Sequence, residues 1–375
     1  MITLVAALYH WPSTWANVRT TSVRDLMPAF LPLWLTLSLA LIWLRLADPG
    51  SAELRIYHFV IMLVGLASAY LGLLKQAEGS SASESPGDRA SWRDYLMLTK
   101  PIVVSLLLVT TLAAMIVGAG RFPPLDAFLW TALGGLLSAG GASALNQYID
   151  RVRDGMMQRT NRRPLPAGRI SGPKAVAFGL FLCVAGLNVF ALGVNVLSAL
   201  MAFIGMLYYV LLYSILLKPT TPQNIVIGGG AGAIPPLVGW VAATNSLTMP
   251  AFFLFALVFF WTPPHFWALA LLKNKEYARA GVPMFPVVYG EQETRVHILL
   301  YALQLVAFTV LMPLADLGSS LFLGVALLLG VGFLSYAWRL WRYGTNKLAW
   351  SMYRYSSTYL ALMFIALVVD TLVTA

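Results

Sequence analysis

Residues 101–119 read PIVVSLLLVTTLAAMIVGA, a stretch without a single charged side chain. A helix needs about 20 mostly apolar residues to cross the hydrocarbon core of a bilayer, so this stretch is long enough to span it. The chain of 375 residues has the same character throughout: it is 59% hydrophobic and only 11% charged, with a mean hydropathy of +0.75. This composition excludes a soluble globular domain and indicates a polytopic membrane protein.

Ten further stretches of the same kind predict transmembrane helices, which makes eleven in all. They lie near residues 27–46, 56–75, 127–145, 175–193, 196–217, 224–242, 250–272, 297–315, 320–338 and 355–374. Strands are not expected, because an open sheet edge cannot be satisfied in hydrocarbon and the alternating pattern of a barrel is missing. The predicted fold class is therefore an all-α polytopic membrane protein.

The orientation of these helices follows from the basic residues of the loops, which favour the cytoplasmic side. With the N-terminus in the cytoplasm, 22 of the 25 Lys and Arg residues fall in cytoplasmic loops, and only Arg45, Arg55 and Arg121 lie on the other side. The C-terminus is then expected on the side opposite the cytoplasm, in a plasma (inner) membrane. Topology also explains the net charge of +10, so no nucleic-acid partner is needed.

The chain divides into three parts. Residues 1–75 form a two-helix appendage, residues 76–93 form a polar linker that includes QAEGSSASESPGDRA, and residues 94–375 form a nine-helix body. Residues 1–20 lack the basic region of a cleaved signal peptide, so the first helix is interpreted as an uncleaved insertion signal. The single cysteine, Cys183, excludes an internal disulfide and a metal site built from cysteines.

The loop after the second body helix, 146–174, begins NQYIDRVRDG and places Asn146, Asp150 and Asp154 four residues apart. On a helix that continues out of the membrane, this spacing stacks the three side chains on one face. Two carboxylates and an amide suit Mg²⁺, which takes oxygen ligands and shares them with substrate phosphates. The arginines that follow, Arg159, Arg162 and Arg163, supply forked donors for phosphate oxygens. A solvated loop whose acids merely pair with its arginines remains the alternative.

The other long loop, 273–296, follows the sixth body helix. The run WTPPHFWALAL puts Pro263 and Pro264 inside a hydrophobic span, where they are expected to break or kink the helix. His265 follows them, and an ionisable side chain at membrane depth indicates a functional site; a histidine bonded to a neighbouring helix is the alternative. A glycine-rich run, 228–232, leaves another helix nearly bare, which indicates close packing.

Four segments resemble the protohaem IX farnesyltransferases (haem O synthases), a branch of the UbiA-type intramembrane prenyltransferases. The segments are DYLMLTKP (94–101), NQYIDRVRDGMMQRTNRRPLPAGRI (146–170), YSILLKPTTPQNIVIGGGAGAIPPLVGW (213–240) and WTPPHFWALAL with EYARAGVPMFPVVYG (261–290). They occur in the family's order over about three quarters of the chain. The resemblance implies nine helices around a lipid-accessible cavity. It also implies transfer of a farnesyl group from farnesyl diphosphate to a vinyl group of haem B, which gives haem O and diphosphate.

The resemblance also implies roles for individual residues. Asn146, Asp150 and Asp154 match the motif that binds Mg²⁺ and diphosphate and would be catalytic. The diphosphate partners would be Arg159, Arg162, Arg163, Lys218, Lys273 and Tyr277, and the haem contacts would be His265, Trp261 and Trp267. Lys273 and Tyr277 stand where many relatives carry a second pair of acids, so Glu276 is the remaining candidate for a further metal ligand. Haem A synthase and terminal-oxidase assembly factors are the protein partners that the resemblance suggests.

Other functions are compatible with parts of this pattern. A UbiA-type enzyme that prenylates a quinone precursor or a chlorophyll-like ring would keep the same diphosphate site. A haem or lipid transporter would carry charges or broken helices near the membrane midplane, whereas the acids here lie in loops. A non-catalytic subunit for oxidase assembly would release no diphosphate, which separates it from the enzymes.

Overall fold

The computed structural model describes residues 90–374. Within this range every regular element is a helix, so the all-α fold is confirmed. Nine of the described helices are long and apolar enough to cross a membrane, and they match the nine spans predicted after residue 94. The expected spans 27–46 and 56–75 and the linker up to residue 89 lie outside the described residues. Trp92 and Arg93, at the end of the expected linker, are already helical.

The first described helix is α5 (Trp92–Leu98), and a short α13 (Asn274–Arg279) lies in the connection after α12. The membrane helices are α6 (Pro101–Ala119), α7 (Leu125–Gly155), α8 (Gly172–Gly193), α9 (Val196–Leu207) with the π-helix η2 (Tyr208–Leu217) and α10 (Lys218–Thr220), α11 (Asn224–Thr244), α12 (Met249–Leu272), α14 (Phe285–Leu311) with the 3₁₀ turn η3 (Met312–Ala315), α15 (Ser320–Tyr343) and α16 (Asn346–Thr374).

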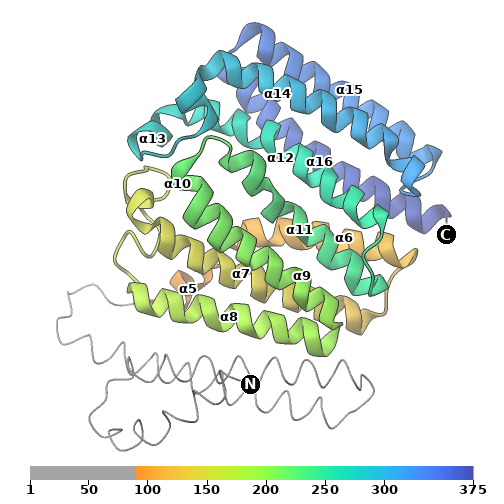
Figure 1. Cartoon of the computed structure of the whole chain (residues 1–375), viewed down its shortest axis with the longest axis horizontal. Helices are drawn as coiled ribbons and strands as arrows, with labels where there is room; N and C mark the ends of the chain where they lie inside the picture. Colours follow the sequence, from red (N-terminus) through yellow and green to blue (C-terminus); the bar gives the residue numbers. More distant parts are fainter. Residues whose placement is uncertain (1–89, 375) are drawn as a thin grey trace, which may run out of the picture.

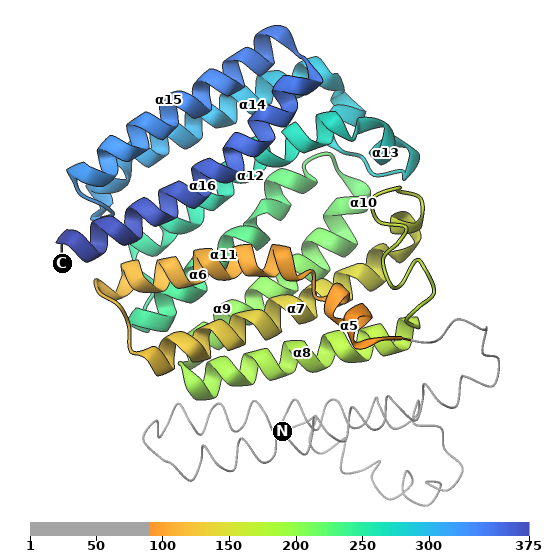
Figure 2. The same cartoon turned by 180° about the vertical axis from the view of Figure 1, so that it is seen from behind.

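The helices are arranged with α11 and α12 in the middle of the bundle (Figure 1). The helices α7 and α8 pack together on one side, and α14, α15 and α16 form the other side. Seen from behind, α6 runs between α7 and α16 and packs along α11 (Figure 2). In both views the two long loops lie at one end of the bundle and the C-terminus lies at the other end. The two loops can therefore contribute to one site.

Close packing of backbones holds the middle of the bundle together. A Cβ atom at Gly239 of α11 would overlap the carbonyl oxygen of Thr111 in α6. Small residues at helix contacts are common in membranes, because association there depends on packing rather than on a hydrophobic force between helices. The glycine therefore sets the distance between α6 and α11.

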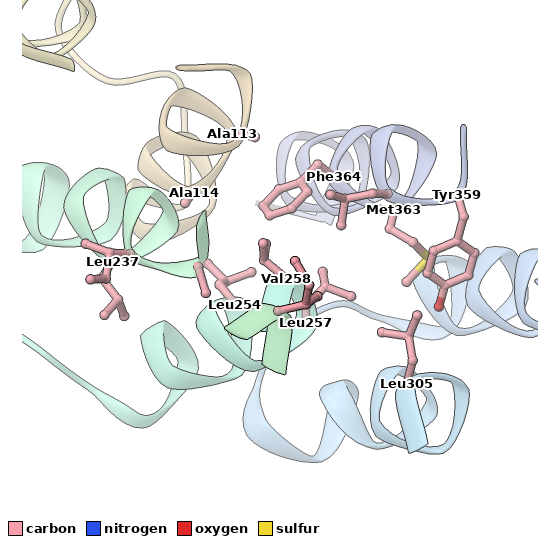
Figure 3. Close-up of a cluster of buried hydrophobic side chains, with 14 of the residues drawn as sticks. Ala113, Ala114, Leu237, Leu254, Leu257, Val258, Leu305, Tyr359, Met363 and Phe364 are labelled. Carbon is pink, nitrogen blue, oxygen red and sulfur yellow. The ribbon is translucent and has the colours of Figure 1, made fainter. Parts of the chain in front are cut away.

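The contact between α12, α14 and α16 is apolar and fully buried (Figure 3). Leu257 of α12 lies on the side of Met363 in α16 and Leu305 in α14, and all three side chains are inaccessible to solvent. His265 lies further along α12, toward its C-terminal end, and contacts Ser356 of α16. Of the expected break or kink at Pro263 and Pro264, the break is wrong: α12 continues through both residues as a single helix. Neighbouring helices in a membrane can compensate for the hydrogen bonds that proline removes.

Candidate functional site

The helix α7 extends beyond the length that a membrane requires and carries the three spaced oxygen-bearing residues in its last turns. Asn146, Asp150 and Asp154 are only 2%, 1% and 4% exposed, so they lie on one buried face, as the spacing predicts. Buried carboxylates are costly unless other groups compensate them. The compensating groups come from three other parts of the chain.

The amide of Asn146 connects two neighbouring helices. Its Oδ1 accepts a hydrogen bond of 2.5 Å from Nζ of Lys100, which immediately precedes α6. Its Nδ2 donates to Ser214 Oγ in η2 at 2.8 Å and to Asp150 Oδ2 at 3.0 Å. Tyr209 of η2 also accepts from Lys100, at 3.3 Å. Asn146 thus joins α7 to both α6 and η2.

The carboxylate of Asp150 is paired on one side only. Nζ of Lys218, the first residue of α10, lies 2.5 Å from Asp150 Oδ2. The other oxygen, Asp150 Oδ1, is buried and has no hydrogen-bond partner within residues 90–374. A buried oxygen without a partner is unusual and indicates a position where an additional group binds.

The loop after α7 folds back onto Asp154. Arg163 donates to Asp154 Oδ2 at 2.6 Å, and Thr160 Oγ1 donates to the backbone carbonyl of Asp154 at 2.9 Å. Arg163 is therefore in the cluster, whereas the side chains of Arg159 and Arg162 are exposed to solvent. The alternative interpretation, in which the acids of the loop pair with its arginines, therefore holds for Arg163 but not for Arg159 or Arg162.

The cations of the cluster oppose one another electrostatically. Burial is the main factor that lowers the pKa of Lys100, to about 7. The neighbouring positive charges of Arg163 and Lys218 lower it further, while Asp150 and Asp154 act in the other direction. A negatively charged group entering between these cations would favour their charged forms.

The side chains of Arg169 and Gln147 hold the loop and α5 beside the cluster. Arg169 donates from Nε to Asp94 Oδ1 of α5 at 2.7 Å and from Nη2 to the carbonyl of Arg162 at 3.0 Å. This guanidinium holds the pKa of Asp94 below its usual range. Gln147 of α7 donates to the carbonyls of Met97 and Leu98 at 2.8 and 3.0 Å.

The second long loop lies near the same cluster. Lys273 pairs with Glu276 Oε1 at 3.0 Å, whereas Asp150 and Asp154 pair with Lys218 and Arg163. Tyr277 and Arg159 both lie within electrostatic range of Tyr213, which stacks on Tyr209 at 5.8 Å. The predicted diphosphate residues are thus gathered at one end of the bundle, with Lys273 and Glu276 at its periphery.

The predicted haem residues separate into two groups. His265 stacks against Trp261 and accepts or donates a hydrogen bond of 2.7 Å with Ser356 of α16. Trp267 lies on another face of α12, where it contacts Phe285 and Tyr301 and is completely buried. Only Trp261 therefore shares the environment of His265.

The oxygen atoms of the cluster fit a hard divalent cation. Asp150 Oδ1 is free to bind, and Asn146, Asp150 and Asp154 provide the carboxylate and amide oxygens that Mg²⁺ prefers. The part of the chain that the structure describes contains no group of three or more His, Cys, Asp or Glu side chains suited to a metal. A cation held here would therefore share its coordination with oxygens of a bound molecule.

Three contributors to the cluster were not among the predicted site residues: Lys100, Ser214 and Tyr209. Lys100 directly precedes the predicted span that starts at Pro101. Its place in the segment DYLMLTKP was the only feature of the sequence that could have indicated a role in the site. Ser214 and Tyr209 reach the cluster because η2 is a π-helix, in which Ser214 Oγ bonds to the carbonyl of Tyr209 at 2.7 Å. Such helices are short and often occur at functional sites.

Comparison with known proteins gives consistent matches. The family model described as the UbiA prenyltransferase family matches residues 107–368. A protoheme IX farnesyltransferase of Roseiflexus sp. (strain RS-1) is 51% identical over 283 residues, which cover 76% of this chain and 53% of that protein. A protoheme IX farnesyltransferase of Ectopseudomonas mendocina (strain ymp) is 47% identical over 283 residues, which cover 76% of this chain and 95% of that protein. The chain thus spans about half the length of the Roseiflexus relative.

Two solved structures share the fold. A digeranylgeranylglyceryl phosphate synthase superimposes with a TM-score of 0.64 at 18% identity, covering 74% of this chain and 98% of its own. A UbiA homologue from Archaeoglobus fulgidus bound to DMAPP and Mg²⁺ superimposes with a TM-score of 0.54 at 17% identity, covering 73% and 99%. At these identities the likeness concerns the arrangement of the helices.

Proposed function

The chain belongs to the UbiA prenyltransferase family, and on that basis we propose that it transfers a farnesyl group from farnesyl diphosphate to a vinyl group of haem B. The products are haem O and diphosphate. The observation that supports the donor is the cluster in which Lys100, Lys218 and Arg163 surround the acids of α7. The names of the relatives support haem B as the acceptor.

The cluster is suited to the departure of diphosphate. An allylic diphosphate ionises more readily where fixed positive groups stabilise the charge that grows on the leaving group. Lys100, Lys218 and Arg163 supply this charge, and Tyr209 holds Lys100 in position. Asn146, Asp150 and Asp154 would hold Mg²⁺, which acts as a Lewis acid on the phosphate oxygens when it is bound. The Mg²⁺ bound to the Archaeoglobus homologue supports this assignment.

The remaining steps need an environment with little water. The bond between farnesyl C1 and the diphosphate oxygen breaks, and C1 forms a bond to the terminal carbon of the vinyl group. The cation left on the porphyrin side chain then takes up water and releases a proton, which leaves a hydroxyl group. Apolar walls from the membrane helices protect the farnesyl cation until this attack occurs.

The remaining sequence predictions are part of the same proposal. The catalytic body comprises residues 94–375, with 1–75 as an appendage. The N-terminus and both long loops face the cytoplasm of a cell whose plasma (inner) membrane holds the protein, and the C-terminus faces the other side. Arg159, Arg162, Lys273 and Tyr277 would approach the diphosphate when it is bound. Proteins that consume haem O, such as haem A synthase and oxidase assembly factors, are the proposed partners.

A pigment assay tests the function directly. The chain is expressed in cells that lack haem O, and the extracted haems are separated by reversed-phase chromatography with mass detection. We expect a new peak at the mass of haem B plus farnesyl and water, which disappears in Asp150→Ala. A folded, well-expressed protein that gives no such peak would contradict haem B as the acceptor. Release of diphosphate with quinone precursors or chlorophyll-like rings would then identify another acceptor, and its absence would exclude transfer.

A further inference from the structure

The imidazole of His265 is enclosed between two aromatic rings. The indole of Trp261 stacks on it with ring centroids 4.3 Å apart, and the phenol of Tyr353 in α16 stacks on it at 4.6 Å. The interplanar angles are 23° and 28°, and two rings this close cannot share one face of an imidazole without overlapping. They therefore cover opposite faces, and Phe266 meets the ring edge-on at 5.1 Å.

The hydrogen bonds of Ser356 determine which nitrogen of His265 carries the proton. Ser356 Oγ donates its single hydrogen to the carbonyl of Tyr353 at 2.7 Å. The same oxygen lies 2.7 Å from His265 Nδ1, so it must accept a hydrogen from that nitrogen. In a neutral imidazole with a proton on Nδ1, the lone pair is on Nε2.

Within residues 90–374, His265 Nε2 forms no hydrogen bond, and it is not one of the fully buried polar atoms that lack a partner, so another group can reach this nitrogen. Both faces and Nδ1 are covered, and the residue retains 8% exposure. A second contact holds the neighbouring side chain, since Trp261 Nε1 donates to the carbonyl of Ser356 at 2.6 Å. A neutral imidazole with a fixed ring, a bonded Nδ1 and a free Nε2 is the arrangement found in histidines that bind metals.

The position of His265 relates this ring to the diphosphate cluster. Thr262, one turn before His265, packs against Gly229 of α11. A Cβ atom at Gly229 would lie only 2.9 Å from Thr262 Cγ2. Gly228, the preceding residue, lies directly against the ring of Tyr213 in η2, the element that leads to Lys218. Through these two glycines, α11 packs against both α12, one turn from His265, and η2.

We propose that His265 Nε2 is an axial ligand of the iron of haem B and that Ser356 is a positioning residue that keeps the proton on Nδ1. The proposal rests on the proposed function, because it assigns an anchor to the acceptor. Iron coordination would hold the porphyrin beside α12, and α11 packs both on α12 near His265 and on η2, which leads to the diphosphate cluster. The stacked rings prevent the imidazole from turning when haem enters and leaves.

The experiment compares two porphyrins on two proteins. The full chain in detergent micelles is titrated with haem B and with metal-free protoporphyrin IX, which has the same propionates and vinyl groups. In the wild type, haem B is expected to bind at least about tenfold more tightly than the metal-free ring. In His265→Ala the two affinities become equal. The ratio cancels changes in the shape of the pocket, because both ligands experience them.

Further variants keep the test specific. His265→Gln retains the size of the side chain but offers iron a poor ligand, so it is expected to lose the preference even if the alanine variant folds poorly. Ser356→Ala is expected to reduce the preference roughly tenfold or less and to shift the absorption spectrum of the bound haem. His297→Ala is the control: this histidine also contacts aromatic rings and pairs with Glu293, yet it should leave the preference and the spectrum unchanged.

The outcomes separate this proposal from the proposed function. If His265→Ala and His265→Gln both keep the preference for haem B over the metal-free ring, the iron ligand is wrong even where haem O is produced. A contact to a propionate would give this result. If the preference is lost but the wild type makes no haem O, the iron site stands and the proposed reaction fails.

Discussion

The polar side chains at the end of α7 differ in whether one of their oxygen atoms remains without a hydrogen-bond partner. Asp154 pairs with Arg163 through Oδ2, and Asn146 uses both of its polar atoms. Asp150 pairs through Oδ2 and keeps Oδ1 without a partner. Its carboxylate is therefore the member of the cluster that is best prepared to bind a cation.

We expect Asp150→Asn to lower the rate of haem O formation by roughly 100-fold or more, because the amide cannot provide the charge that holds a divalent cation. The substitution keeps the volume of the side chain, so the protein should remain folded. The pigment assay measures the change. Asp126→Asn is a matched control, since it removes an exposed acid from the other end of the same helix. Turnover equal to wild type in Asp150→Asn would show that this carboxylate binds no essential metal.

The residues of the cluster were predictable to different degrees. The spacing of Asn146, Asp150 and Asp154 along one helix predicted a shared face, because a helix has a fixed period. Lys100 and Ser214 contact Asn146 across 46 and 68 residues of sequence. Such contacts depend on how α6 and η2 pack against α7, and a single sequence carries no record of this packing. The separation of Trp267 from His265 has the same origin.

At the scale of elements, the loop after α7 is fastened to the bundle by a few polar contacts. The pair of Arg169 and Asp94 joins it to α5. The pKa of Asp94 is lowered by Arg169, so this stabilisation is complete above the ordinary carboxyl pKa of 3.8 and is lost as the pH falls below it. At neutral pH the contact is fully formed.

We predict that Asp94→Asn increases the rate of tryptic cleavage within residues 156–171 by about two- to fivefold at pH 7. Arg169 is partly exposed, so the ion pair contributes no more than about 1 kcal/mol, and the population of the open loop rises accordingly. The substitution leaves every trypsin site in place. Mass spectrometry of the fragments over time measures the rate. Asp126→Asn serves as the control, and an equal increase in that variant would assign the effect to charge alone.

The contact between α6 and α11 depends on a glycine. We expect Gly239→Ala to destabilise the protein by about 1–3 kcal/mol, because the added methyl group overlaps the backbone of Thr111 and the helices must separate. Thermal unfolding in detergent, followed by gel filtration of the remaining folded protein, measures this. Gly232→Ala on the same helix has no neighbour within 4 Å and should be neutral. Equal melting of both variants would contradict close backbone contact.

The positions of the helices could be predicted where they depend on hydropathy alone. The nine spans follow from runs of apolar residues, whereas the π-helix at Tyr208–Leu217 is apolar like any other span and gives no such signal. The prolines of α12 do not end the helix, because proline removes a hydrogen bond in any helix but packing decides whether the helix ends. Gly290, with φ of 85°, marks a bend within α14.

At the scale of the whole molecule, the orientation in the membrane can be measured with single cysteines. In a Cys183→Ala background, we expect Gln158→Cys to react with a membrane-impermeant maleimide only after the cells are permeabilised. Ser246→Cys, in the exposed connection between α11 and α12, is expected to react in intact cells from which the outer envelope has been removed. Cys183 is buried, so the parent chain should give no signal in either case. The reverse pattern would invert the proposed topology.

The pairing of the site's own charges has a consequence for how the donor arrives. Asp150 and Asp154 are each paired with a cation of the same protein, and Lys100 is held by Asn146. A divalent ion entering alone would displace these cations without offering them new counterions, and a diphosphate entering alone would draw them away from the acids. When both arrive together, the acids bind the divalent ion and the cations bind the diphosphate, so the net charge of the cluster changes little. If the proposed function holds, we expect the donor to enter by exchange of ions, with the metal and the diphosphate binding cooperatively.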